Sequence, residues 1–218
     1  MHRKTFLLPI TLTFLFIITC AFAPVTNAQT TQKTTTEVEE PESHFQKAHE
    51  LFLKKDLKAA ASEIRKGVAF LKQEAGSAAK DGKKDLTASI HELEKLANEV
   101  EKGAVTSEKR LKDAFARAHQ ALANHHYLKA SEYWAKKEEK KTGHALESAA
   151  IHFEHAVVWF EHKFETGEDI VIKDIHTVAG KLVEGKKWTE EEVSKGIKDI
   201  GSEISKLGKK TKPKNKSE

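Results

Sequence analysis

Residues 115–164 read FARAHQALANHHYLKASEYWAKKEEKKTGHALESAAIHFEHAVVWFEHKF and hold seven of the chain's twelve histidines. Apolar side chains recur in this segment every three or four residues, which is the period of one face of an α-helix. The charge-dense run at residues 136–141 and Gly143 interrupt the pattern. The segment therefore predicts two amphipathic helices, and we expect the second to continue to Gly167.

The rest of the chain repeats this helical pattern. No proline occurs between Pro41 and Pro213, and the residues between them are rich in Ala, Leu, Glu and Lys, which favour helices. A short helix is expected first, and apolar seams then lie at residues 57–78, 86–100, 111–122, 146–164, 171–182 and 193–207. We predict an all-α fold, an antiparallel bundle of about six amphipathic helices arranged in hairpins.

Two pairs of residues mark expected helix starts. Ser43 with Gln46, and Thr189 with Glu192, have the spacing of a capping box, in which the two side chains satisfy free backbone amides. Trp188 precedes the second pair, at the position of a hydrophobic staple. We therefore expect a short helix from about His44 to Leu53, just after Ser43, and another helix that begins just after Thr189.

The N-terminus has the layout of a secretory signal peptide. A short basic start precedes an uncharged apolar run that ends at Ala23. A proline follows Ala23 and disfavours cleavage there, so we expect cleavage after Ala28, with residues 1–28 as the signal peptide. Two alternatives stay open: an uncleaved membrane anchor, and lipidation at Cys20, whose preceding residues resemble a lipobox.

The expected mature chain is exported, to the periplasm or the medium, and divides into four parts. Residues 29–42 form a disordered Thr-rich linker, residues 43–167 the helical-bundle core domain, residues 168–208 a C-terminal amphipathic helical hairpin, and residues 209–218 a disordered basic tail. Cleavage removes the only cysteine. The mature protein therefore has no disulfide and no thiolate, and its stability must come from packing.

The charge balance bears on the class of partner. Loss of the signal peptide removes Arg3 and Lys4 and leaves a net charge of about +2 on the mature chain. Binding to nucleic acid needs a concentrated basic field. We therefore expect no nucleic-acid partner.

The histidines of residues 115–164 fall into two groups. A helical projection places three histidines of the second helix nearly opposite its phenylalanines, and these are His144, His155 and His162. We expect this strip to face solvent or a partner, with His152 to one side. On the first helix, His125 continues the apolar seam while His119 and His126 lie along its edge. We expect these three to be partly buried.

All seven histidines are candidate metal ligands. His152 and His155 are three residues apart and close enough to share one ion, whereas His162 lies two turns from His155. Neutral imidazoles of this kind suit a transition metal or a haem iron. The simpler interpretation is that the histidines cap the edges of the core through hydrogen bonds, which leaves the protein without a cofactor.

The motifs of several enzyme classes are missing from the sequence. No acidic residue stands three positions before any histidine, so the Glu-x-x-His pairs of di-iron bundles are absent. The sequence also lacks His-Glu-x-x-His, Cys-x-x-Cys-His and Gly-x-Ser-x-Gly. We predict an exported, non-catalytic helical binding or scaffolding protein of the cell envelope. The alternatives are a histidine-rich metal- or haem-binding protein and a membrane-surface-associated helical protein.

The sequence contains a short internal echo, in which residues 45–66 resemble residues 115–136. Six positions match across an interval of seventy residues, five of them with the same residue: Phe45, Ala48, His49, Leu57, Ala60 and Lys66 correspond to Phe115, Ala118, His119, Tyr127, Ala130 and Lys136. An internal duplication and chance both explain this echo. The two hairpins resemble tetratricopeptide-like helical pairs through Phe45, Ala48, Phe52 and Ala61, and through Phe115, Ala118 and Leu122. This resemblance implies a scaffold that binds a peptide or a protein.

The expected partners follow from the apolar seams. Regular heptads serve pairing within a chain and between chains equally, so we expect a protein partner or self-association. The aliphatic stripes of residues 168–208 stand beside lysines and suit a membrane surface. The alternative is that both stripes pack inside the bundle, because the glycines of this region would weaken an isolated helix by about 1 kcal/mol each.

Overall fold

The computed structural model describes residues 41–161 and 168–211 of the chain. These ranges hold seven helices and no strand: α1 (Pro41–Leu53), α2 (Leu57–Ser77), α3 (Lys80–Glu101), α4 (Glu108–Ala135), α5 (Glu139–Trp159), α6 (Glu168–Glu184) and α7 (Glu190–Thr211). The predicted all-α fold is confirmed. The expected signal peptide, most of the linker and most of the basic tail lie outside the described residues, as does His162.

One of the two predicted capping boxes is present. At the start of α7 the Thr189 backbone N–H donates to Glu192 Oε2 at 3.0 Å, and the Glu192 N–H donates to Thr189 Oγ1 at 3.1 Å. The box predicted at Ser43 was wrong. α1 begins at Pro41, three residues before the expected start, and a missing N–H costs nothing at this first position of a helix. Ser43 therefore lies inside the first turn, and the Gln46 side chain donates to Glu42 at 2.7 Å.

α5 ends earlier than the sequence pattern predicts. Its last residue is Trp159, and Glu161 has a φ of +54°, which a right-handed helix does not contain. The prediction that this helix continues to Gly167 was therefore wrong. The apolar period outlasts the helix because Phe160, just beyond it, still packs against the core.

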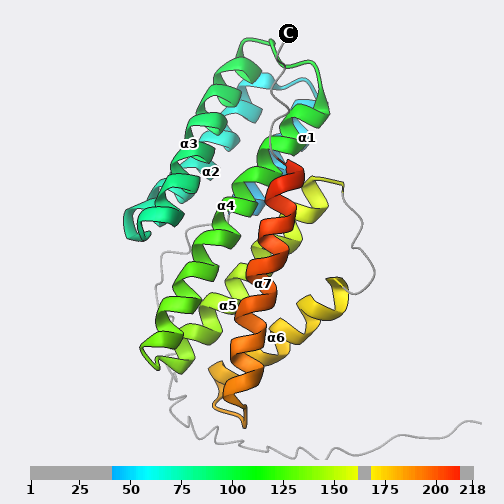
Figure 1. The fold of residues 1–218 in the computed structure, drawn as a ribbon. Coiled ribbons are helices and arrows are strands. Elements are labelled where there is room, and N and C mark those ends of the chain that lie inside the picture. Colours follow the sequence, from blue (N-terminus) through cyan, green and yellow to red (C-terminus); the bar gives the residue numbers. More distant parts are fainter. Residues whose placement is uncertain (1–40, 162–167, 212–218) are drawn as a thin grey trace, which may run out of the picture. The chain divides into compact units, whose positions relative to one another are not determined.

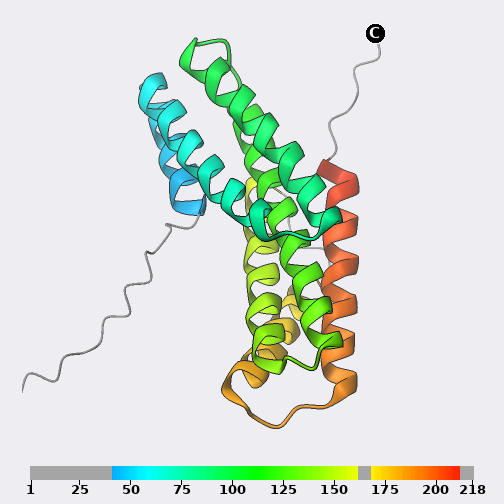
Figure 2. The same cartoon turned by 90° about the vertical axis from the view of Figure 1, so that its left-hand side faces the viewer.

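α4 and α5 form the centre of the bundle. α4 packs against α5 and also contacts α3, α7, α1 and α2, while α5 contacts α6 and α7. Figures 1 and 2 show α7, drawn in red, alongside α4, although two helices separate them in the sequence. Side chains on α4 are therefore surrounded on several sides, which explains why its burial is not confined to one stripe.

The apolar core consists of two clusters that meet along α4 and α5. The first joins α1, α2, α3 and the N-terminal half of α4, and the rings of Phe45 and Phe115 stack in it with centroids 4.4 Å apart. These two phenylalanines are the matching residues of the internal echo. The second cluster joins the rest of α4 to α5, α6 and α7 around Phe153. Alanines on α4 and α5 let the two backbones approach closely.

The aliphatic stripes of α6 and α7 lie inside the bundle. Their buried members are Ile172, Ile175, Val178, Leu182, Val193, Ile200, Ile204 and Leu207. An association of these stripes with a membrane surface would require the two helices to leave the bundle first. Among the described residues, no helix is both long enough and apolar enough to cross a membrane.

Candidate metal centre

Five of the seven candidate histidines gather between α4 and α5. His119, His125 and His152 are almost completely buried, with exposed fractions of 0%, 1% and 4%. His126 and His155 are half-buried, whereas His144 is exposed and His162 lies outside the described residues. We call the five gathered side chains the histidine array: His119, His125, His126, His152 and His155.

One expectation about α5 needs correction. His155 was expected on an outward strip with His144, but its ring lies 5.1 Å from the ring of His119, centroid to centroid. His152, which was expected to one side of this strip, is buried against α4. A helical projection of α5 alone does not show that these histidines are covered. The side of α5 that carries them has no apolar seam, yet α4 packs on it.

The array is continuous from one carboxylate to another. Glu42 on α1 lies 2.8 Å from His119 Nε2, and His119 Nδ1 lies 3.2 Å from His152 Nδ1. The His152 ring stacks on that of His126 with centroids 5.4 Å apart, and His126 neighbours His125. Glu74 on α2 closes the array through His125. Imidazoles of α4 and α5 therefore connect a carboxylate of α1 with a carboxylate of α2.

At the first end, Glu42 is held as a carboxylate. Its Oε2 accepts a hydrogen bond from Trp159 Nε1 at 2.8 Å and lies 3.8 Å from His155 Nδ1. Burial alone would raise the pKa of this carboxyl. The His119 ring, the Trp159 N–H and the electrostatic effect of His155 outweigh burial and lower the pKa to about 2. Glu42 is thus anchored by three aromatic side chains.

At the other end, Glu74 faces two consecutive histidines of α4. Glu74 Oε2 lies 3.0 Å from His125 Nε2 and 4.0 Å from His126 Nε2. One ligand atom from each of these three residues lies within 4.8 Å of the other two. Lys129 Nζ is 3.8 Å from the same carboxylate oxygen. We call Glu74, His125 and His126 the Glu74 centre.

The packing of α3 orients the His125 ring. A Cβ atom added at Gly82 would lie 3.4 Å from both Cα and Nδ1 of His125. The backbone of α3 therefore closes the Nδ1 side of the ring, and Nε2 is the nitrogen that meets Glu74. At this distance an added Cβ would make ordinary van der Waals contact, so an alanine would also fit at position 82.

The charge states of this region favour metal binding. The hydrogen bond with His125 lowers the pKa of Glu74 and outweighs the opposing effect of burial. Burial lowers the pKa of His126 to about 4 and that of His152 well below 6.5. At neutral pH the centre therefore offers the Glu74 carboxylate and the lone pair of neutral His126, and a metal ion at His125 Nε2 would displace the proton that this nitrogen donates to Glu74.

The sequence pattern missed both carboxylates of the array. A search for acidic residues three positions before a histidine tests one helix at a time, and Glu42 and Glu74 reach the array from α1 and α2. The pattern also missed His176 on α6, which lies 2.9 Å from Glu147 and 3.3 Å from Glu154 of α5 and belongs to a separate ion-pair cluster. Only the pairing of helices brings these groups together.

Comparisons with known proteins found no matching family model, no matching curated protein and no matching solved structure. The class of the protein therefore follows from its own geometry. It is an all-α protein with a buried histidine–carboxylate array between its two central helices.

Proposed function

We propose that the protein binds one divalent transition-metal ion through the Glu74 centre. The observation that supports this is the convergence of Glu74 Oε2, His125 Nε2 and His126 Nε2 in a partly enclosed place. Zinc bonds to nitrogen and oxygen are about 2.0–2.2 Å long, which sets ligand atoms of a tetrahedral site about 3.4 Å apart. The 3.0 and 4.0 Å separations from Glu74 bracket this spacing.

The ligand set selects the kind of ion. Two imidazoles and one carboxylate suit Zn²⁺, Ni²⁺, Co²⁺ or Cu²⁺, whereas Ca²⁺ and Mg²⁺ take oxygen ligands. We propose an ion in preference to a haem. A haem needs a macrocycle-sized cavity beside its axial ligand, and three of the five array rings are almost fully covered by neighbouring side chains.

The proposed role is binding without catalysis, in an exported protein. The proposed role agrees with the non-catalytic binding protein predicted from the sequence. It adds that the bound ligand is a metal ion. It is supported by the signal-peptide pattern of residues 1–28 and by the missing catalytic motifs. A compartment outside the cytoplasm suits a site built from imidazole and carboxylate, because such a site needs no reduced thiol.

The test is calorimetric titration of the full purified chain with Zn²⁺ and Ni²⁺ after treatment with a chelator. We expect one equivalent to bind with a Kd in the low micromolar range or tighter. The variants Glu74→Gln and His126→Ala should weaken binding by at least about 100-fold, or about 2.7 kcal/mol. His144→Ala is the matched control, because it removes an exposed histidine outside the array.

Two results would overturn the proposal. One is a Glu74→Gln variant that binds as tightly as the wild type, because the affinity would then come from other groups, such as surface histidines. The other is full affinity in His126→Ala. Circular dichroism of each variant checks that the helical fold is kept.

A further inference from the structure

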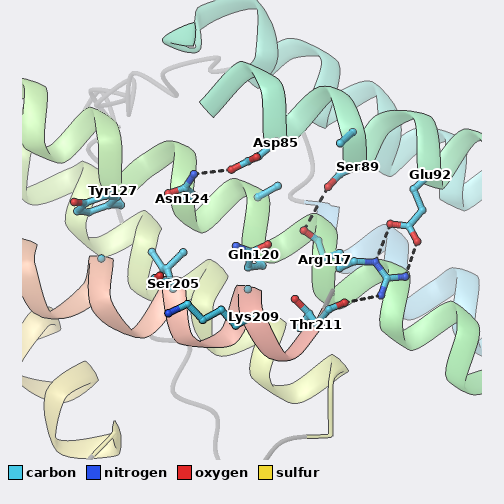
Figure 3. A pocket seen from close by; sticks show the side chains of 15 residues that line it. Asp85, Ser89, Glu92, Arg117, Gln120, Asn124, Tyr127, Ser205, Lys209 and Thr211 are labelled. Atoms are coloured by element: carbon cyan, nitrogen blue, oxygen red, sulfur yellow. Dashed lines mark hydrogen bonds and ion pairs between the residues drawn. The ribbon is translucent and has the colours of Figure 1, made fainter. Parts of the chain in front are cut away.

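A groove runs between α3, α4 and α7, and none of the array histidines lines it. Its volume is about 680 Å³, within the size range of small-molecule sites. Figure 3 shows its lining, with Asp85, Ser89 and Glu92 on one side, Gln120, Asn124 and Tyr127 on the floor, and Ser205 and Lys209 on the other side. The groove is therefore a second feature of the fold, separate from the Glu74 centre.

Small residues of α7 create the space. A Cβ atom at Gly201 would lie 2.7 Å from the Tyr127 ring, and one at Gly208 would lie 2.8 Å from Gln120 Nε2. The Tyr127 ring leaves no room for a Cβ at position 201, whereas the flexible end of the Gln120 side chain can shift to admit one at position 208. Ser205 lies between them and adds only a hydroxymethyl group, which leaves the volume above α4 open.

Two of the four charged side chains that line the groove, Arg117 and Glu92, are paired with each other. Arg117 Nε donates to Glu92 Oε2 at 2.8 Å, and Arg117 Nη1 donates to the Thr211 carbonyl at 3.1 Å. Asn124 Nδ2 donates to Asp85 at 2.8 Å. These bonds join α3, α4 and α7, so the groove is held in shape before any ligand arrives, and its one guanidinium is already occupied.

Neutral groups remain available for a ligand. The Gln120 amide and the hydroxyls of Tyr127 and Ser205 line the groove, and no hydrogen bond joins them to another side chain that Figure 3 draws. Amides and hydroxyls both donate and accept hydrogen bonds. Ala88, Ala121 and Ile204 add apolar surface beside the Tyr127 ring.

We propose that this groove binds a neutral polyhydroxylated molecule of about the size of a disaccharide. Its hydroxyl groups would pair with the Gln120 amide and the Tyr127 and Ser205 hydroxyls, and its C–H faces would pack on the Tyr127 ring. A phosphate or carboxylate ligand is disfavoured because Glu92 binds the Arg117 guanidinium and because the carboxylates of Asp85 and Glu92 balance the charges of Arg117 and Lys209, which leaves the groove without a net positive charge. The proposal is independent of the metal site.

The test is saturation-transfer NMR of the full chain with maltose, trehalose and N,N′-diacetylchitobiose. Citrate and glucose 6-phosphate serve as charged comparators. We expect saturation transfer to at least one neutral disaccharide and none to the charged compounds. Ser205→Trp fills the groove and should weaken that binding by at least about tenfold.

The matched control is Ser194→Trp, which adds the same side chain at an exposed position of the same helix, about 16 Å along its axis. It should leave disaccharide binding unchanged. The proposal is overturned if no neutral disaccharide binds, if only the charged compounds bind, or if Ser205→Trp, folded by circular dichroism, binds as the wild type does.

Discussion

His119 Nδ1 and His152 Nδ1 lie 3.2 Å apart, and both rings are buried between α4 and α5. Two imidazole nitrogens at this distance share one hydrogen, so one ring donates and the other accepts. His152 contacts His119, which meets Glu42, and it also stacks on His126, which belongs to the Glu74 centre. The protonation state of His152 therefore affects both ends of the array.

His152 should remain neutral throughout the physiological pH range. Burial lowers its pKa well below 6.5, and the neighbouring histidines act in the same direction. We expect its ring ¹⁵N resonances to stay those of a neutral imidazole from pH 8 to pH 5. The reference is the urea-unfolded chain, whose histidines titrate near pH 6.5. A native midpoint near that value would contradict the buried position of the ring.

Phe153 should be a principal support of the second core cluster. Its side chain is 1% exposed among residues of α4, α5 and α6. Phe153→Ala should lower the free energy of unfolding by about 3–5 kcal/mol, measured by urea denaturation. Val158→Ala is the control, because Val158 is 66% exposed on the same helix, and it should change stability by less than about 0.5 kcal/mol. Equal effects of the two variants would mean that α5 presents another face to the core.

Glu42 should make the fold sensitive to acid. Its pKa is about 2 in the folded protein and near 4.5 when unfolded, so its contribution is complete above pH 4.5 and is lost as the pH falls toward 2. The shift corresponds to at most about 3 kcal/mol. Glu42→Gln should lower stability at pH 7 and flatten the loss of stability between pH 4.5 and 2. Parallel curves for wild type and variant would show that Glu42 is not anchored by His119 and Trp159.

Lys129 should weaken the proposed metal binding. Its ammonium group lies 3.8 Å from Glu74 Oε2 and therefore repels any cation that this oxygen binds. Lys129→Met should tighten Zn²⁺ binding by about tenfold, or about 1.4 kcal/mol, in the same titration. Lys136→Met is the control, since Lys136 pairs with Glu132 at the end of α4 and not with Glu74. Unchanged affinity in Lys129→Met would place the ion elsewhere.

The sequence predicts the fold well because each helix carries its own signal. The apolar seams of α2, α4 and α7 have helical period, and the Thr189 and Glu192 pair marks a helix start that the structure contains. Helix ends were less predictable where an apolar residue beyond the helix still packs against the core. Phe160 does this after the end of α5, so the apolar period of the sequence continues past the helix.

The candidate site was only partly predictable. The six predicted histidines that lie in the described residues were recognised from their density, and five of them do gather in space. The sequence could not reveal that His155 turns toward His119, because that depends on how α4 covers α5. It could not reveal Glu42 or Glu74 either, since their partners lie 77 and 51 positions along the chain.

The most direct test of the proposed metal site is anomalous diffraction from crystals of the full chain loaded with Zn²⁺, recorded on both sides of the zinc absorption edge. The account predicts one strong anomalous peak within about 2.0–2.2 Å of Glu74 Oε2, His125 Nε2 and His126 Nε2. A peak only at exposed histidines such as His91 or His144, with none at these three atoms, would contradict it.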